Sequence, residues 1–147
     1  MMQRVIAGIV CTSALGWAAA AHAQIPVGTW ERTDVQGKGI VMTATKCCNG
    51  GLRLVYNIPA TQGQPANTMT VDSPMDGTDV PVLVGGKPSG ETMAIKRLDD
   101  KHYDAVLKMN GQPFGTARST LSADAKTITV DGVYGTQKTT ETWVRKQ

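Results

Sequence analysis

A strict alternation of side-chain polarity over residues 102–109 is the feature that most constrains the fold of this chain. Its apolar set is Tyr103, Ala105, Leu107 and Met109. Side chains of a strand point alternately to its two faces, so this period predicts a strand with one face in a core. Asn110-Gly111 follows, and this dipeptide readily takes the positive φ angles of a two-residue type I′ turn. Residues 113–121 are therefore predicted to be the return strand of a hairpin.

The same pattern of short strands and turns extends over most of the chain. Turn residues recur about every eight to twelve positions, and after residue 23 there is no stretch of helical periodicity long enough to predict a helix. The predicted strands are residues 29–34, 39–45, 52–58, 67–71, 80–84, 91–98, 102–109, 113–121, 127–133 and 138–146. Such an order predicts an all-β fold, a single antiparallel meander barrel of about eight to ten short strands, because closure removes unpaired edges. A two-sheet sandwich is the alternative.

The first 23 residues have the composition of a cleaved signal helix. Arg4 precedes a charge-free apolar run from residue 5 to residue 20, and Ala21 and Ala23 are the small residues expected before a signal-peptidase site. The run is too short for a typical transmembrane helix. We therefore expect residues 1–23 to be a signal peptide, a mature domain over residues 24–147, a periplasmic or secreted location, and no stable membrane span after cleavage.

Composition narrows the class of partner. The formal net charge is only +3, aromatic residues make up 5% of the chain, and Phe114 is its one phenylalanine. Single-stranded nucleic acids are usually bound by stacked aromatic side chains within a basic groove, and this chain has little of either. We expect no nucleic-acid partner. Protein partners are not indicated by any motif.

Two aromatic segments at the ends of the mature chain, together with several turns, carry a resemblance to a known family. The segments are Gly28-Thr29-Trp30 and Trp143-Val144-Arg145; the turns and strand ends are Asp76-Gly-Thr-Asp-Val-Pro-Val82, Lys96-Arg-Leu-Asp99, Asn110-Gly111 and Ser122-Ala-Asp-Ala-Lys-Thr-Ile-Thr129. The chain resembles small exported bacterial proteins of lipocalin-like, calycin-type fold that have no assigned reaction or ligand. It departs from their pattern at Ala125, where glycine is usual.

The resemblance implies a closing cluster in which a late cation packs over the first tryptophan. We therefore expect Trp30, Trp143 and Arg145 to meet where the first and last strands pair. Inward alternation also predicts the lining of a small apolar cavity, by Leu54, Tyr56, Met93, Ile95, Tyr103 and Leu107. These expectations favour a non-enzymatic exported barrel that binds a small hydrophobic or amphipathic molecule. A packed structural envelope protein without a ligand is an alternative.

Cys47 and Cys48 are the two cysteines of the mature chain, and they are adjacent. In an oxidising compartment they are expected to pair as a disulfide, which for neighbouring residues closes a strained ring. We interpret the pair as a structural staple of a loop. A thiol-dependent redox site, or a site for a soft metal, is the alternative.

Other chemistry-bearing residues have simpler explanations. His102 and Asp104 share a strand face, where a carboxylate can orient an imidazole, but a solvated outer face is the favoured interpretation. The scattered methionines are expected to fill the core, with Met42, Met93 and Met109 pointing inward. Asp99 and Asp100 lack the spacing of a calcium-binding EF-hand loop. We therefore expect no catalytic residue, no metal site and no cofactor.

Overall fold

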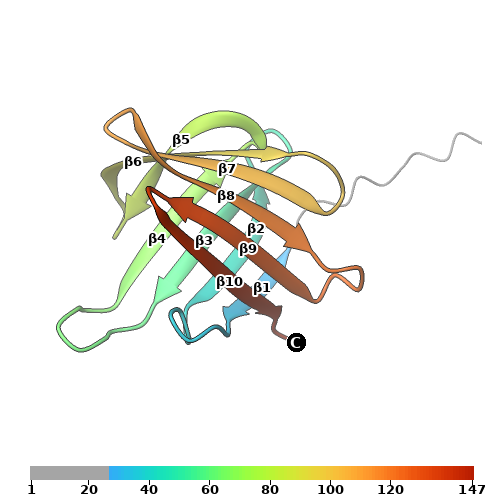
Figure 1. Cartoon of the computed structure of the whole chain (residues 1–147), viewed down its shortest axis with the longest axis horizontal. Coiled ribbons are helices and arrows are strands. Elements are labelled where there is room, and N and C mark those ends of the chain that lie inside the picture. Colours follow the sequence, from blue (N-terminus) through green and yellow to red (C-terminus); the bar gives the residue numbers. More distant parts are fainter. Residues whose placement is uncertain (1–26) are drawn as a thin grey trace, which may run out of the picture.

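The computed structural model describes residues 27–147, which form one closed barrel of ten antiparallel strands (Figure 1). The strands are β1 (Gly28–Arg32), β2 (Val41–Cys47), β3 (Gly51–Ile58), β4 (Asn67–Ser73), β5 (Asp76–Val84), β6 (Lys87–Arg97), β7 (His102–Met109), β8 (Gln112–Leu121), β9 (Thr127–Tyr134) and β10 (Gln137–Arg145). Each strand pairs with the next along the chain. The predicted all-β meander barrel is confirmed, and the predicted signal peptide lies outside the described residues.

Pairing of the first and last strands closes the barrel. In the β1–β10 ladder Trp30 lies opposite Arg145, and Glu31 lies opposite Val144. This ladder gives both terminal strands a second neighbour, so neither is left as an open edge. The sandwich alternative is therefore wrong, because two separate sheets would leave edges that this closed order does not have.

The two ends of the barrel differ in how they are filled. At one end, which we call the packed end, lie the start of β1, the end of β2 and the turns 48–50, 74–75, 98–101 and 122–126. Its core includes Trp30, Ala44, Leu52, Val71, Ser73 and Val82, whose exposed fractions are all 0% or 1%. At the other end, the open end, lie segments 33–40 and 59–66 and the tight turns 85–86, 110–111 and 135–136.

The turn chemistry agrees with the sequence where the hairpins are tight. Asn110 and Gly111 have φ angles of 49° and 81°, the two positive values that a type I′ turn requires. Ala125 also has a positive φ, of 56°. A left-handed backbone is unfavourable for a residue with a Cβ atom, which gives a physical reason for glycine at this position in the proteins that the sequence resembles.

Two strand boundaries and the burial of one methionine differ from the predictions. β5 and β6 begin several residues earlier than expected. Across its two register shifts, the β5–β6 ladder continues back to Asp76 in β5 and to Lys87 in β6, next to the tight Gly85-Gly86 turn, whose φ angles are positive. Met109, predicted to fill the core, is 40% exposed because it ends β7 at the rim of the open end. Met42 is buried and Met93 half-buried, as expected.

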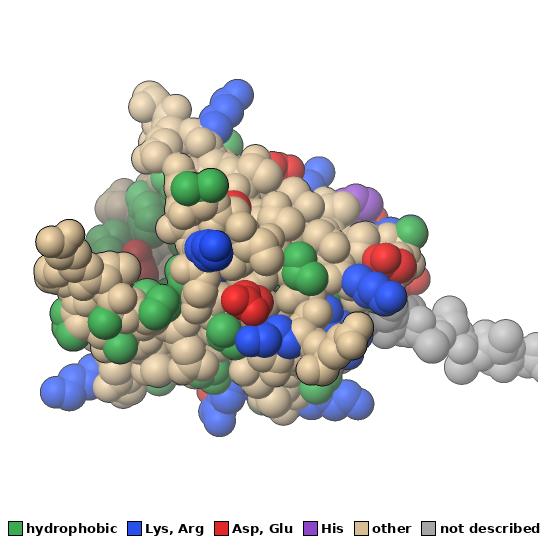
Figure 2. Space-filling model, turned by 90° about the horizontal axis from the view of Figure 1, so that it is seen from below, with side chains coloured by type: hydrophobic (Ala, Val, Ile, Leu, Met, Phe, Trp, Pro, Cys, Tyr) green, Lys and Arg blue, Asp and Glu red, His purple; other side chains and the backbone are tan. Residues whose placement is uncertain are grey.

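Within residues 27–147, no helix is long and apolar enough to cross a membrane. Figure 2 shows one face of the molecule, on which basic and acidic side chains are scattered among polar ones. They do not gather into one basic area on this face.

Candidate functional site

An internal cavity of about 420 Å³ occupies the middle and the open end of the barrel. All six residues predicted to line it do so: Leu54, Tyr56, Met93, Ile95, Tyr103 and Leu107. Other apolar side chains complete the wall, among them Ile40, Met42, Met69, Ala105, Ala117, Ile128 and Val130. Their role in binding a ligand stays a prediction. The interior of a barrel widens with the number of strands, and the inward side chains at this end of the ten-strand barrel do not fill it.

Arg32 places a charged group in the cavity wall at the end of β1. Its Nε and Nη2 donate to the two carboxylate oxygens of Asp34 at 2.7 and 3.0 Å, and its Nη1 lies 3.3 Å from Glu141 Oε1. The side chains of Arg32 and Glu141 are 13% and 21% exposed. The hydrogen bond from Arg32 lowers the pKa of Asp34 to about 2. All three guanidinium nitrogens therefore already face carboxylates of this chain.

Glu141 links this ion pair to an aromatic group. Its Oε2 accepts a hydrogen bond from Trp143 Nε1 at 3.0 Å, and the indole packs edge to face against Tyr56 with ring centroids 5.7 Å apart. Edge-to-face packing is a favoured arrangement of aromatic rings. Burial, followed by the negative charge of Glu141, raises the pKa of Tyr56, so its hydroxyl stays neutral.

Tyr134 lies over Gly115 of β8 and Gly132 of its own strand β9, and its ring occupies the space that a Cβ atom at either glycine would need. A Cβ atom at Gly115 would stand 2.4 Å from the Tyr134 ring, and one at Gly132 would stand 2.6 Å from it. The ring thus borders the cavity from the end of β9. Thr139 Oγ1 also faces Gly132 and is, among the described residues, the buried side-chain polar atom that has no hydrogen-bond partner.

Glu91 is the second glutamate of the cavity wall. It lies on β6 opposite Met109, close to the rim, and none of the ion pairs formed by residues 27–147 includes it. Asp104 also borders the cavity, but Arg118 donates to both of its carboxylate oxygens at 2.7 and 2.8 Å.

The sequence analysis missed the charged part of the site. Arg32 follows the buried Trp30 by two positions, and Glu141 precedes the buried Trp143 by two. A period of two puts each charged residue on the same inward face as its tryptophan. Counting two positions along the strand from each tryptophan would have identified Arg32 and Glu141 as inward-facing residues.

The expected closing cluster lies near the packed end. Arg145 stands over Trp30, with its guanidinium carbon 5.8 Å from the ring centroid, and its Nη2 donates to the Val27 carbonyl at 2.9 Å. Trp143 is in the same buried core as Trp30, and its ring packs against Tyr56. The cation therefore sits on the first tryptophan, while the last tryptophan forms part of the cavity wall.

The adjacent cysteines close the β2–β3 turn at the packed end. A disulfide joins Cys47 to Cys48, and one ligand atom from each of Cys47, Cys48 and Asp72 lies within 4.8 Å of the others. As a disulfide the pair offers no thiolate to a metal. Asp72 is itself engaged, since Arg53 donates to both of its carboxylate oxygens at 2.7 Å.

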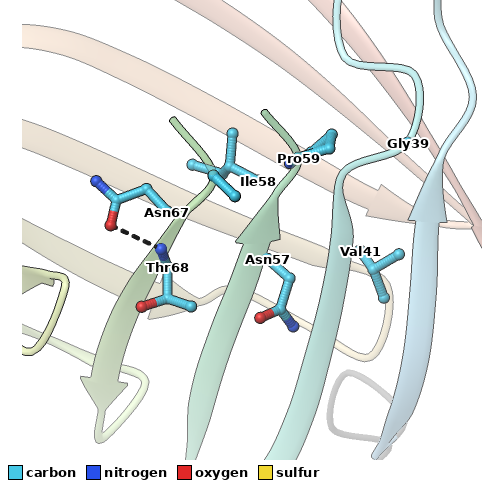
Figure 3. Close-up of a pocket in the computed structure, with 8 residues that line it drawn as sticks. Gly39, Val41, Asn57, Ile58, Pro59, Asn67 and Thr68 are labelled. Atoms are coloured by element: carbon cyan, nitrogen blue, oxygen red, sulfur yellow. Dashed lines mark hydrogen bonds between the residues drawn. The ribbon is translucent and has the colours of Figure 1, made fainter. Parts of the chain in front are cut away.

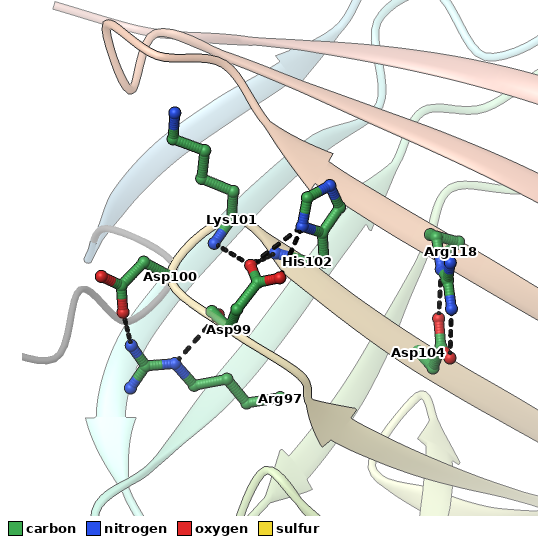
Figure 4. Close-up of polar contacts among 7 residues, drawn as sticks. All are labelled: Arg97, Asp99, Asp100, Lys101, His102, Asp104 and Arg118. Atoms are coloured by element: carbon green, nitrogen blue, oxygen red, sulfur yellow. Dashed lines mark hydrogen bonds and ion pairs between the residues drawn. The ribbon is translucent and has the colours of Figure 1, made fainter.

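His102 and Asp104, considered as a dyad in the sequence, each have a different partner (Figure 4). His102 Nδ1 lies 2.9 Å from both carboxylate oxygens of Asp99, and Asp104 pairs with Arg118. Asp99 also accepts from the backbone N–H groups of Lys101 and His102. The contacts of Asp99 order the β6–β7 turn, the Asp104–Arg118 pair joins β7 to β8, and both are exposed to solvent.

A second depression, of about 470 Å³, is a shallow groove at the open ends of β2, β3 and β4 (Figure 3). Val41, Asn57 and Thr68 contribute from successive strands, and Asn67 Oδ1 accepts from the Thr68 N–H at 2.8 Å. The groove opens broadly to solvent, and none of its lining residues is charged. It lacks the enclosure and the charged groups that distinguish the internal cavity.

No protein-family model matches the sequence, and a comparison with curated proteins finds no significant match. Among solved structures, the chain is similar to a mutant of the fluorescent protein UnaG. The TM-score is 0.60 with 10% sequence identity, and the match covers 84% of this chain and 97% of that one. At this identity the similarity shows the fold, a calycin-type barrel.

Proposed function

We propose that this protein is an exported, non-enzymatic binding module that holds a small hydrophobic or amphipathic molecule inside its barrel. The observation that carries the proposal is the internal cavity of about 420 Å³, which combines a mostly apolar wall with a few charged and aromatic groups. Binding sites for small molecules commonly span about 300–1,000 Å³ and have this composition. The alternative, a fully packed structural barrel, predicts no such cavity.

The cavity predicts where binding energy would arise. A ligand would remove from water the apolar surface of Met93, Ile95 and Leu107, and each buried methylene group contributes about 0.8 kcal/mol. The packed end beyond Trp30 limits how deep a ligand can reach. Entry is from the open end, where Phe114 at the rim is 37% exposed.

Filling the cavity tests this function. Ala117 lies on the cavity wall between Ala105 and Gly132 on the neighbouring strands, and Ala117→Phe would put a ring into the empty space. Thr116→Phe, an exposed position on the same strand, is the matched control. The probe is Nile red, a neutral dye whose emission shifts in apolar surroundings.

Wild type and Thr116→Phe are expected to bind Nile red with a blue-shifted emission, and Ala117→Phe to lose binding by at least about tenfold while it stays folded. Native mass spectrometry of protein purified from its source, after mild desalting, would show whether a molecule is carried along. If wild-type protein binds neither the dye nor a co-purifying molecule, the binding function is wrong.

Export has its own test. N-terminal sequencing of protein from the periplasmic or secreted fraction should begin at Gln24, the residue after the expected cleavage site. Recovery of a chain that still begins with Met1 from a membrane fraction would contradict export, and it would leave the binding function standing.

A further inference from the structure

We propose that the ligand is an amphipathic amine whose cationic head pairs with Glu91 at the rim while its apolar body lies in the cavity. This inference rests on the proposed binding function and specifies the chemical class of the ligand. It starts from the charges of the cavity wall and of the groups bonded to it. Arg32 and Arg118 supply two positive charges, and Asp34, Glu91, Asp104 and Glu141 supply four negative ones.

Neither cation is available to an anionic head group, and Arg118 already donates to both carboxylate oxygens of Asp104. Arg32 donates two hydrogen bonds to Asp34, and its remaining terminal nitrogen faces Glu141. A ligand carboxylate would have to displace one of these carboxylates and then lie beside it, and like charges at close range disfavour the charged form of both. The wall therefore selects against a carboxylate head.

Glu91 and Glu141 differ in whether the carboxylate forms an ion pair within residues 27–147. Glu141 uses one oxygen for Arg32 and the other for the Trp143 indole N–H. None of the ion pairs of residues 27–147 includes Glu91, although it borders the cavity. A carboxylate at an apolar wall is stabilised by a cation that reaches it, and a charge-assisted hydrogen bond is stronger than a neutral one.

The residues that follow Glu91 on β6 offer an apolar surface for the body of the ligand. Glu91, Met93 and Ile95 follow one another at alternate positions of β6, and all three border the cavity. Glu91 is nearest the rim, and Ile95 is buried with an exposed fraction of 6%. An ammonium group on Glu91 would thus be continuous with an alkyl or aryl body that lies along Met93 and reaches Ile95.

Three probes with the same alkyl chain and different heads test the inference: dodecylamine, which is cationic at neutral pH, neutral dodecanol and anionic dodecanoate. Dissociation constants are measured by displacement of Nile red at pH 7, below the micellar concentrations. We expect dodecylamine to bind about tenfold tighter than dodecanol, and dodecanoate to bind more weakly than either.

Two variants test whether Glu91 causes the expected preference for the cationic head group. Glu91→Gln should reduce dodecylamine affinity by about tenfold, leave dodecanol unchanged and strengthen dodecanoate. Glu31→Gln is the matched control, because the third glutamate of the chain lies on the outer side of β1 beside Lys146. It should change none of the three affinities. Equal losses for all three probes in Glu91→Gln would overturn the role of its charge.

The outcomes separate this inference from the function on which it rests. Tight binding of dodecanoate, or equal binding of all three probes, would overturn the amine assignment while the cavity remains a binding site. Binding of none of the three, together with no Nile red binding, would overturn the binding function itself.

Discussion

The packed end and the open end of the barrel are built from the same ten strands, yet they differ in what their inward side chains do. At the packed end Trp30, Leu52 and Val71 are fully buried and fill the interior. At the open end Arg32, Glu91 and Glu141 face inward with a cavity between the strands. The comparison shows that one alternating pattern supports stability at one end and leaves room for a ligand at the other.

The largest expected effect is on the core of the packed end. Trp30→Ala should lower the free energy of unfolding by about 3–5 kcal/mol, because it removes a fully buried ring and leaves a cavity. Leu107→Ala, on the cavity wall, should cost only about 2 kcal/mol, because Leu107 already borders empty space. Urea unfolding of both variants measures the contrast, and equal losses would show that the two ends do not differ.

A backbone contact gives the next contrast. A Cβ atom at Gly51 would stand 2.0 Å from the Ser73 carbonyl oxygen, so Gly51→Ala must shift backbone and should cost about 1–3 kcal/mol. At the open end, Gly115→Ala meets only the Tyr134 ring, which can rotate away. The second variant should remain stable and change the NMR signals of Tyr134. Unfolding of Gly115→Ala at the same denaturant concentration as Gly51→Ala would contradict this view.

The ion pair at the open end predicts a pH dependence. The pKa of Asp34 is about 2 in the folded protein, held down by the hydrogen bond from Arg32, against about 3.9 in an unfolded chain. Its contribution to stability is therefore complete well above pH 4 and is lost as the pH falls toward 2. Asp34→Asn should be less stable than wild type by about 1–2 kcal/mol at pH 7. In unfolding experiments at decreasing pH the difference should shrink below about pH 4; a constant difference would contradict the linkage.

The β8–β9 turn at the packed end contains a correctable strain. Ala125 has a φ of 56°, so Ala125→Gly should stabilise the protein by about 1 kcal/mol by relieving its left-handed backbone. Ala123→Gly in the same turn is the control, since Ala123 has no positive φ, and it should not stabilise. Thermal unfolding of the two variants measures the difference, and a lower midpoint for Ala125→Gly would show that the turn has another conformation.

The smallest expected effect on binding comes from the cysteines. The double substitution Cys47→Ser and Cys48→Ser alters a turn at the packed end, away from the open end, so Nile red affinity should stay within about twofold of wild type. A thiol titration of wild type over a redox series would accompany it. A midpoint of roughly −120 to −270 mV, or loss of binding in the variant, would favour the redox alternative over a structural staple.

The sequence by itself determined the class of fold because the information for strands and tight turns is local. Alternation over residues 102–109 and the Asn110-Gly111 turn predicted a hairpin that the structure contains with both positive φ angles. It also determined which apolar side chains face inward, since Leu54 and Tyr56 need only a period of two to be placed. Met109 failed this rule because burial depends on its distance from the rim, which alternation does not encode.

Only the tertiary structure decided that a cavity exists and what charge its wall carries. Arg32 and Asp34 lie two positions apart in the sequence. Glu141 lies more than a hundred positions later, and it comes close to Arg32 only because the last strand, β10, pairs with the first strand, β1. Whether inward side chains meet or leave a space depends on the strand number and on the sizes of residues from opposite strands, which no single segment specifies. The packed end and the open end share one local pattern, and closure of the barrel is what makes them different.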